Sequence, residues 1–545
     1  MKLPAVVAEI LKREGVKQLI GYPVNPIIEA AAEADIRTII VRQERTGLHM
    51  ADAMSRLSSG ESIGVFTMQD GPGTENAFGG VAQAYGESSP ILVLPAGYPR
   101  NIAQLQPNFS AYLNFQHVTK HLEQPLTAAT VPDALRRAFT QLKNGRPRPA
   151  MVEIPKDLFA EDLPEPLPYR SAPRARTAPD PRDVARAAKA LVAAKRPVIY
   201  AGQGVHYSKA WDSLRALAEL LEAPVMTSLQ GKSAFPENHP LALGSGGRAV
   251  PKPVHHFLQN ADVIFGIGCS FTRTNFGVSM PAGKTYIHAT LDEADLNKNL
   301  ESDYVVLGDA GLTLEAFVDA VRDEIGNKPR GRAAAVAAEI AAVKAEWLEQ
   351  WLPKLRSNDA PLSPYRVLWD LFNTVDVPNT IITHDAGSPR DQLSPFWEST
   401  TPLSYIGWGK TTQLGYGLGL VMGAKLAQPD KLCINVWGDA AIGFTGMDFE
   451  TAARERIPIL SILLNNFCMA IELPIMQTAT RKYRSTDISG NYADMARAFG
   501  GYGERVTTPD QIIPAIQRGI AQTREGKPAL LEFITQQETQ VSVFK

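Results

Sequence analysis

Two short stretches, VWGDAA at residues 436–441 and LLNNFC at residues 463–468, decide the fold of this chain. Each begins with apolar residues and ends abruptly in small or polar ones, which is typical of a buried parallel strand that reaches the carboxyl edge of its sheet. Between them, residues 444–453 carry apolar side chains at helical spacing. A strand, a helix and a second parallel strand form a right-handed unit whose strand ends lie at one edge. The sequence therefore predicts that Asp439 and Asn466 face the same crevice.

A carboxylate and an amide oxygen at one sheet edge suit a hard cation that prefers oxygen ligands. Magnesium usually takes one or two protein carboxylates and fills its remaining positions with water and substrate phosphates. The alternative interpretation is structural, with Asp439 capping a helix and Asn465-Asn466 forming a turn. The residue pattern by itself leaves both interpretations open.

The composition is that of an ordinary globular protein. Hydrophobic residues make up 44% and charged residues 21% of the 545 residues, and this length predicts roughly three to four domains. The net charge of −2 disfavours a nucleic-acid partner. The three cysteines, Cys269, Cys433 and Cys468, lack metal-ligand spacing, which favours a reduced intracellular protein.

The N-terminus shows no signal-peptide pattern, and no apolar run is long enough to span a bilayer. We therefore expect a cytoplasmic protein without a membrane partner.

Strand and helix patterns alternate along the whole chain, which predicts an α/β fold of three consecutive domains with mostly parallel sheets. The predicted domains are residues 1–162, 183–330 and 365–545. A proline-rich linker at 163–181 separates the first two. An alanine-rich helix at 332–355 and a second linker at 353–364 precede the last. The predicted strands are 18–20, 38–41, 63–67, 91–94 and 150–154 in the first domain, and 197–201, 225–227, 263–267 and 285–288 in the second.

The opening motif resembles the diphosphate anchor of thiamin-diphosphate enzymes, in which Gly-Asp-x is followed about two dozen residues later by Asn-Asn after an apolar strand. The resemblance implies that Asp439, Asn466 and the carbonyl of Cys468 bind the Mg²⁺ that holds the diphosphate. It also implies contacts to the cofactor from the neighbouring residues Gly438, Ala440, Ala441 and Met469. Ala440 departs from the family, which usually has Gly-Asp-Gly.

The order of the three domains is similar to that of the acetolactate synthase, 2-oxo acid decarboxylase and 2-hydroxyacyl-CoA lyase type. This resemblance implies a pyrimidine-binding domain, a central domain and a diphosphate-binding domain, and it extends over essentially the whole chain.

Glu44 matches the family's catalytic glutamate, which follows the second strand of the first domain and precedes an alanine-rich helix. The resemblance implies that this carboxylate hydrogen-bonds the pyrimidine ring of thiamin and favours the reactive tautomer. The alternative is a glutamate placed at a helix N-terminus by the helix dipole.

Two glycine turns fall in the same register. Gly21-Tyr22-Pro23 resembles the Gly-Tyr-Pro of acetolactate synthases, and residues 71–76, from Gly71 through Gly73 to Asn76, resemble their Gly-Pro-Gly-Ala-Thr-Asn. Glycine at such turns permits close approach of a ligand to the backbone. Gln69 and Asp70 replace the smaller residues expected there, and we predict that they shape the substrate pocket.

In the last domain, Leu414 stands where the family places the apolar side chain that wedges beneath thiamin and forces its rings into a V. That shape brings the reacting groups together. An ordinary core leucine is the alternative.

The sequence motifs say less about the substrate than about the cofactor. Tyr22 and the lack of a His-His pair in the first domain disfavour a simple pyruvate decarboxylase. Glu472 resembles a glutamate that follows the metal asparagine in those enzymes and is predicted to be catalytic; a solvated helix residue is the alternative. Arg273 stands where acetolactate synthases place an arginine that contacts substrate and flavin, with a surface arginine as the alternative. Residues 535–545 after the last strand leave room for only a short lid.

These observations predict a thiamin-diphosphate- and Mg²⁺-dependent lyase or carboligase that acts on a 2-oxo acid, an aldehyde or an acyl-CoA. The alternatives within the family are a 2-hydroxyacyl-CoA lyase and a decarboxylase of another 2-oxo acid. The resemblance implies a homodimer or homotetramer with active sites at the subunit interface. Glycine pairs at 202–204 and 266–268 lack a full fingerprint, so FAD or ADP in the central domain is an alternative without support. A nucleotide-binding protein and a silent regulatory subunit are the alternatives from other classes.

Overall fold

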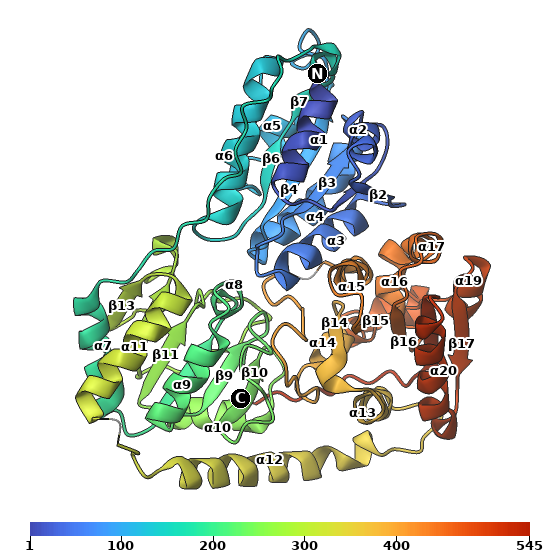
Figure 1. Cartoon of the computed structure of the whole chain (residues 1–545). Helices are drawn as coiled ribbons and strands as arrows, with labels where there is room; N and C mark the ends of the chain where they lie inside the picture. The colour runs from blue at the N-terminus through green and yellow to red at the C-terminus, as the bar shows by residue number, and fades with distance from the viewer. Residues whose placement is uncertain (327, 412, 545) are drawn as a thin grey trace.

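The computed structural model describes residues 1–326, 328–411 and 413–544, which form three α/β domains with parallel sheets (Figure 1). The predicted fold class is confirmed. The N-terminal domain lies above the other two, and the long helix α12 (Ala333–Leu355) runs beneath the central and C-terminal domains.

The N-terminal sheet has the strand order β2-β1-β3-β4-β6-β5, with β7 paired to β4. Its strands are β1 (Gln18–Gly21), β2 (Arg37–Ile40), β3 (Gly64–Met68), β4 (Ile91–Gly97), β5 (His121–Glu123), β6 (Ala150–Val152) and β7 (Ile154–Pro155). Its helices are α1 (Leu3–Arg13), α2 (Ile27–Glu33), α3 (Glu44–Leu57), α4 (Pro72–Gly86), α5 (Ala111–Asn114) and α6 (Val131–Lys143). Apolar residues of α1, α2 and α6 form one core cluster with the sheet, while α3 and α4 contribute to another.

The central sheet has the order β10-β9-β8-β11-β12-β13. Its strands are β8 (Pro197–Ala201), β9 (Val225–Ser228), β10 (Ala242–Gly246), β11 (Val263–Ile267), β12 (Thr285–Thr290) and β13 (Tyr304–Leu307). Its helices are α7 (Pro181–Ala193), α8 (Gly204–Tyr207), α9 (Trp211–Leu221), α10 (Lys252–Asn260) and α11 (Ala310–Ile325). The two outer strands β10 and β13, like β5 in the first domain, were not predicted.

The C-terminal sheet has the order β14-β15-β16-β18-β17. Its strands are β14 (Thr380–His384), β15 (Leu432–Gly438), β16 (Leu460–Asn465), β17 (Tyr502–Val506) and β18 (Ala529–Ile534). Its helices are α13 (Pro364–Thr374), α14 (Ser388–Leu393), α15 (Tyr416–Ala427), α16 (Asp439–Thr445), α17 (Phe449–Arg454), α18 (Gln477–Tyr483), α19 (Tyr492–Ala498) and α20 (Ile512–Arg524). Because β15 and β16 are adjacent and parallel, their carboxyl ends meet at one edge, as predicted.

Two local predictions differ from the structure. The helix expected at 444–453 is broken by a 3-10 turn, η5 (Gly446–Asp448), so that α16 and α17 are separate. The second linker does not begin at Pro353, because this proline lies inside the last turn of α12, which continues to Leu355.

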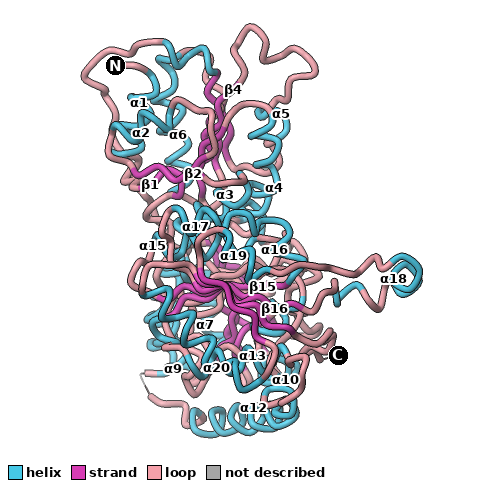
Figure 2. The backbone as a smooth tube through the Cα atoms, turned by 90° about the vertical axis from the view of Figure 1, so that its right-hand side faces the viewer, coloured by secondary structure: helices cyan, strands magenta, loops and turns pink. Residues whose placement is uncertain are grey.

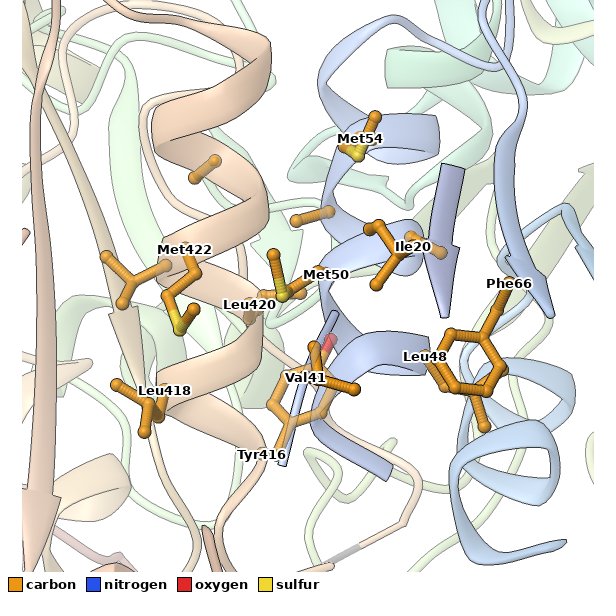
Figure 3. Packing of buried hydrophobic residues seen from close by; sticks show 14 of the residues in the cluster. Ile20, Val41, Leu48, Met50, Met54, Phe66, Tyr416, Leu418, Leu420 and Met422 are labelled. Carbon is orange, nitrogen blue, oxygen red and sulfur yellow. The ribbon is translucent and has the colours of Figure 1, made fainter. Parts of the chain in front are cut away.

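Helix α3 packs against helix α15, and this contact joins the N-terminal and C-terminal domains (Figure 3). Gly419 and Gly423 permit the close approach: a Cβ at Gly419 would lie 2.5 Å from the carbonyl oxygen of Thr46, and one at Gly423 would lie 2.2 Å from that of Met50. Core residues from both helices belong to a single cluster that continues into both sheets.

A buried carboxylate holds all three domains together. Glu87 accepts hydrogen bonds from the backbone N–H groups of Gly409 (3.1 Å), Lys410 (2.8 Å) and Thr411 (2.9 Å) in the C-terminal domain. It also accepts one from Nε2 of Gln230 in the central domain, at 3.0 Å.

The substitution Gly423→Ala should destabilise the chain by about 2 kcal/mol or more, because the added methyl group overlaps backbone atoms of α3 that have no room to move. Urea unfolding measures the change. Gly443→Ala is the matched control, since the same substitution in α16 meets nothing within 4 Å and should stabilise by about 0.5–1 kcal/mol. Equal effects of the two substitutions would contradict the close helix contact.

Candidate functional site

A cleft lies at the carboxyl edge of the C-terminal sheet, with an empty volume of about 630 Å³. We call it the C-terminal cleft. Nine of the residues predicted to bind cofactor, metal or substrate line it: Leu414, Gly438, Asp439, Ala440, Ala441, Asn466, Cys468, Met469 and Glu472.

Asp439 is the first residue of α16, and its side chain is only 3% exposed. Its carboxylate accepts hydrogen bonds from the backbone N–H of Ala440 (2.9 Å) and of Cys468 (3.1 Å). Burial nevertheless dominates and raises the pKa of Asp439 to about 6. A cation beside this carboxylate would favour its ionised form.

The Asn465-Asn466 turn is held in place by its own side chains. Oδ1 of Asn465 accepts from the N–H of Phe467 (3.0 Å), and Oδ1 of Asn466 accepts from the N–H of Cys468 (2.9 Å). Phe467 adopts a left-handed φ of 56°, which turns the chain sharply after β16. Nδ2 of Asn465 donates to the fully buried carboxylate of Glu532 at 2.8 Å.

These groups fit the oxygen-ligand chemistry of Mg²⁺. The cleft brings one carboxylate, one amide oxygen and a backbone carbonyl together. Among the described residues, no group of three or more His, Cys, Asp or Glu side chains could hold a metal ion. A site built from few protein oxygens and completed by phosphate oxygens is what Mg²⁺ prefers.

The sequence interpretation missed one wall of the cleft. Ala386, Gly387 and Ser388, which follow β14, line it together with Gln392 of α14. The signal was present, because the apolar strand at 380–384 also ends abruptly in small and polar residues. Thr535 and Gln536 line the opposite side.

The chain after Gln536 does not close over the cleft. Its last residues run to the central domain, where Oγ of Ser542 donates to the carbonyl of Val250 (2.7 Å) and Phe544 stacks on His255. The last described residues thus pack on the central domain and form no lid over the cleft of their own chain.

The other predicted site residues lie at the carboxyl edge of the N-terminal sheet, which we call the N-terminal edge. Glu44 begins α3 and is 3% exposed, and burial raises its pKa although Asn76 hydrogen-bonds to it. Gly21 ends β1 beside β3, and Tyr22 and Pro23 follow it.

The glycine turn after β3 is closely packed. Gly71 has a positive φ of 58°, and a Cβ there would meet the hydroxyl of Tyr98 at 2.4 Å. A Cβ at Gly73 would meet Cγ of Gln69 at 2.9 Å and Oε1 of Glu44 at 3.4 Å. Glycine is therefore required at both positions, and Gln69 shares the space beside Glu44.

None of the N-terminal edge residues lines the C-terminal cleft of the same chain. The structure thus brings the predicted residues together as two groups on two domains.

Arg273 belongs to neither group. Its side chain is exposed, and its backbone N–H donates to Oδ1 of Asn299 at 3.0 Å. Its neighbours Thr272 and Thr274 line a separate cavity of about 1030 Å³ between the domains, which we call the central cavity. A contact from Arg273 to substrate stays a prediction.

Comparison with known proteins identifies the family. The chain matches the models for the thiamine pyrophosphate enzyme N-terminal TPP binding domain at residues 1–125, the central domain at 184–317 and the C-terminal TPP binding domain at 385–533. A probable acetolactate synthase large subunit from Methanocaldococcus jannaschii is 30% identical and covers 98% of this chain and 92% of its own length. The acetolactate synthase isozyme 3 large subunit of Escherichia coli is 28% identical and covers 96% and 92%. The chain belongs to the thiamine pyrophosphate enzymes.

As a thiamine pyrophosphate enzyme, the chain carries its two groups of site residues on the two domains whose family models are named for binding this cofactor. Thiamine pyrophosphate as the predicted organic cofactor, the predicted resemblance to acetolactate synthases and the predicted enzyme class are confirmed. Which side chains touch the cofactor stays a prediction.

No helix in the described part of this thiamine pyrophosphate enzyme is long and apolar enough to cross a membrane.

Two buried asparagines on neighbouring strands test how the Asn465-Asn466 turn is held. Asn465→Ala removes bonds to Phe467 and Glu532, so we expect a loss of about 2 kcal/mol in unfolding free energy and weaker thiamine pyrophosphate binding by calorimetry. Asn435 on β15 is equally buried, but neither polar atom of its side chain has a partner among the described residues. Asn435→Ala should therefore cost less and leave cofactor affinity unchanged. The reverse order would contradict this role of Asn465.

Proposed function

We propose that the chain is a Mg²⁺-dependent carboligase or lyase that takes a 2-oxo acid as acyl donor. The observation that carries the proposal is the buried Asp439 beside the Asn466 turn, in a cleft that also contains Leu414. The full-length similarity to proteins named acetolactate synthase large subunit supports it.

Each group has a role that its position permits. Asp439, Asn466 and the carbonyl of Cys468 hold Mg²⁺ and, through it, the diphosphate. Leu414 supports the bend between the cofactor rings. Glu44 holds a proton against the pyrimidine ring, and its buried, partly desolvated carboxyl is suited to share that proton. Bound thiamine pyrophosphate supplies the carbon at which the bond next to a carbonyl is broken and formed.

Glu472 is the second carboxylate in the C-terminal cleft. It lies half-buried at the end of a 3-10 turn, Ala470–Glu472. From there it can pass protons to or from substrate, and its negative charge disfavours retention of a substrate carboxylate in the cleft.

We place the active site between two chains, in a homodimer or a homotetramer. The N-terminal edge and the C-terminal cleft are separate in one chain, and exposed apolar side chains occur near both. Val24 (72%) follows the first group, and Phe444 (49%), Met447 (55%) and Ile475 (78%) belong to the domain of the second. Helix α18 projects from the body of the chain with no buried residue (Figure 2). These exposed apolar side chains are available for a contact between chains.

The central cavity is the place for a nucleotide such as FAD or ADP, if one is bound. It is large, lies next to the glycine turns Gly202–Gly204 and Gly268, and contains both cations and carboxylates, including Arg146, Asp292 and Lys410. A flavin absorbance band near 450 nm that corresponds to about one bound flavin per chain would favour FAD.

The two family alternatives differ in the acyl donor. A 2-hydroxyacyl-CoA lyase would release an aldehyde from an acyl-CoA, and a decarboxylase would release only carbon dioxide and an aldehyde from its 2-oxo acid. A product screen of the holoenzyme against these three classes distinguishes them.

Removal of the metal carboxylate tests the anchor. Asp439→Ala should abolish Mg²⁺-dependent binding of thiamine pyrophosphate, because the remaining amide and carbonyl oxygens carry no charge to balance the metal. Titration calorimetry with and without Mg²⁺ measures the loss. Asp430→Ala removes an exposed aspartate of the same domain and should bind normally. Unchanged affinity in Asp439→Ala would refute the anchor.

Mixed subunits test where the active site lies. Glu44→Gln and Asp439→Ala should each be inactive alone. Refolded or co-expressed together, they should regain about a quarter of wild-type activity per chain, because half of the dimers are then mixed and one of their two sites carries no substitution. If Glu44 acted on the cofactor of its own chain, every site would keep one defect and mixing would restore nothing.

A further inference from the structure

An ion pair at the N-terminal edge is formed by two residues that are not among those assigned to the cofactor. Nζ of Lys156 lies 2.8 Å from Oδ2 of Asp70, and the two side chains are 47% and 18% exposed. Asp70 follows β3, and Lys156 follows β7, so 86 residues of chain separate partners that the sheet brings together. The pair therefore stands at the mouth of the edge, open to an incoming molecule.

The pair lies directly beside the predicted catalytic group. Asp70 is preceded by Gln69, whose side chain shares the space of Glu44 at Gly73, and is followed by Gly71, which touches Tyr98. Lys156 lies 5.9 Å from the ring centre of that tyrosine. Glu44 and the ion pair thus lie at the same end of the sheet, linked by the turn from Gln69 to Gly73.

Among the described charged residues near the pair, Glu153 and Arg100 already have partners, and Arg42 lies 3.9 Å from Glu450. Glu153 is 4% exposed, and its Oε2 accepts from the N–H of Tyr112 (3.1 Å) and from Gln124 (3.0 Å). Burial, with a contribution from the charge of Asp70, raises the pKa of Glu153 to about 7. Arg100 is bound to Asp157 (2.7 Å) and Glu161 (3.1 Å).

The arginine next to Glu44 is also engaged. Arg45 points toward the C-terminal domain, where Nη1 donates to the carbonyl of Leu414 (3.5 Å) and the guanidinium covers the ring of Phe444 at 5.6 Å.

The C-terminal cleft, which we place opposite the N-terminal edge of a second chain, also offers no positively charged side chain from the part of the chain that the structure describes. Of the described residues that line it, none is Lys, Arg or His, and its charged side chains are Asp439 and Glu472. When the positive charge of the metal and the negative charges of the diphosphate and Asp439 offset each other, the charged group left to face the substrate is the carboxylate of Glu472.

We infer that the acceptor in the carboligation is an uncharged carbonyl compound, an aldehyde, and that Asp70 excludes a second 2-oxo acid by neutralising Lys156. This inference rests on the proposed function and names the acceptor of that same site. A donor 2-oxo acid is compatible with it, because its carboxylate leaves as carbon dioxide, whereas an acceptor 2-oxo acid would keep its charge beside a lysine that Asp70 already neutralises.

The reaction balances without another reactant. The bond between the donor's carbonyl carbon and its carboxylate breaks, and carbon dioxide leaves. The electron pair left behind forms the new bond to the aldehyde carbon, and the aldehyde oxygen takes one proton. The product is a 2-hydroxy ketone with no net oxidation or reduction.

The test compares two acceptors that carry the same ethyl group on the carbonyl carbon, propanal and 2-oxobutyrate. The holoenzyme is supplied with pyruvate, or with whichever 2-oxo acid it decarboxylates, as the donor. We expect the wild type to prefer propanal at least tenfold in kcat/KM. Asp70→Asn frees Lys156 and should raise kcat/KM for 2-oxobutyrate at least fivefold relative to propanal. Adding Lys156→Gln should return the ratio to that of the wild type.

Asp133→Asn is the matched control, because it breaks an exposed pair with Arg136 on α6 of the same domain and should not change the ratio. Arg273→Ala tests the rival source of positive charge and should also leave the ratio unchanged. A wild type that uses 2-oxobutyrate as well as propanal overturns the inference. So does a kcat/KM ratio of the two acceptors that does not change in Asp70→Asn, or one that changes only in Arg273→Ala. Failure of the proposed function looks different, since no 2-oxo acid would then release carbon dioxide even without an acceptor.

Discussion

The contact between α3 and α15 constrains everything else in this structure. Two helices approach so closely only where glycine replaces a side chain, and Gly419 and Gly423, one turn apart, face the backbone of α3. The interface also buries Arg56, which is paired to Asp52 at 2.6 Å and donates to the hydroxyl of Tyr416 and to the carbonyl of Gly407. Such a pair stabilises one arrangement because loss of either partner leaves a buried charge uncompensated.

This contact fixes both halves of the chemistry. Helix α3 begins at Glu44, and α15 begins two residues after Leu414, so one interface sets the positions of two residues to which we assign roles in the proposed function. Asp448 adds to the constraint by accepting from the N–H of Arg42 at 2.7 Å. A rigid joint of this kind keeps Glu44 out of the cleft of its own chain. In the homodimer proposed above, a second chain supplies the missing half.

The sequence predicted the parts of this arrangement that are local. A strand that ends in polar residues is visible in a short window, and the edges after β2, β15 and β16 were found in this way. The same pattern after β14 was overlooked, although Ala386 and Gly387 form a wall of the cleft. Short outer strands such as β5 were missed because three half-buried residues carry too weak a pattern. The sequence predicts a boundary at Pro353, yet α12 continues through this proline to Leu355.

Contacts between distant segments lay beyond a single sequence. The sequence around Asp70 does not predict its partner Lys156. In the same way, the sequence around Glu87 does not predict its contact with residues 409–411, and the sequence around Val250 does not predict its contact with the chain end. These pairings arise only when the sheets bring strand ends together, and they involve charged or polar groups whose local pattern is indistinguishable from that of a solvated surface.

The difference between what local sequence predicts and what only the fold brings together has a chemical consequence. Thiamine pyrophosphate brings the same reactive carbon to every member of the family, and the residues that hold it are recognisable from short motifs for that reason. What enters next is selected by charges at the mouth of the site, where electrostatic interactions are least screened by cofactor groups and where each substitution changes the balance by a whole charge. At the N-terminal edge, Asp70 pairs with Lys156, so that loss of Asp70 would leave one positive charge without this partner. A change of that size leaves the cofactor machinery intact and alters which carbonyl compound can remain beside it.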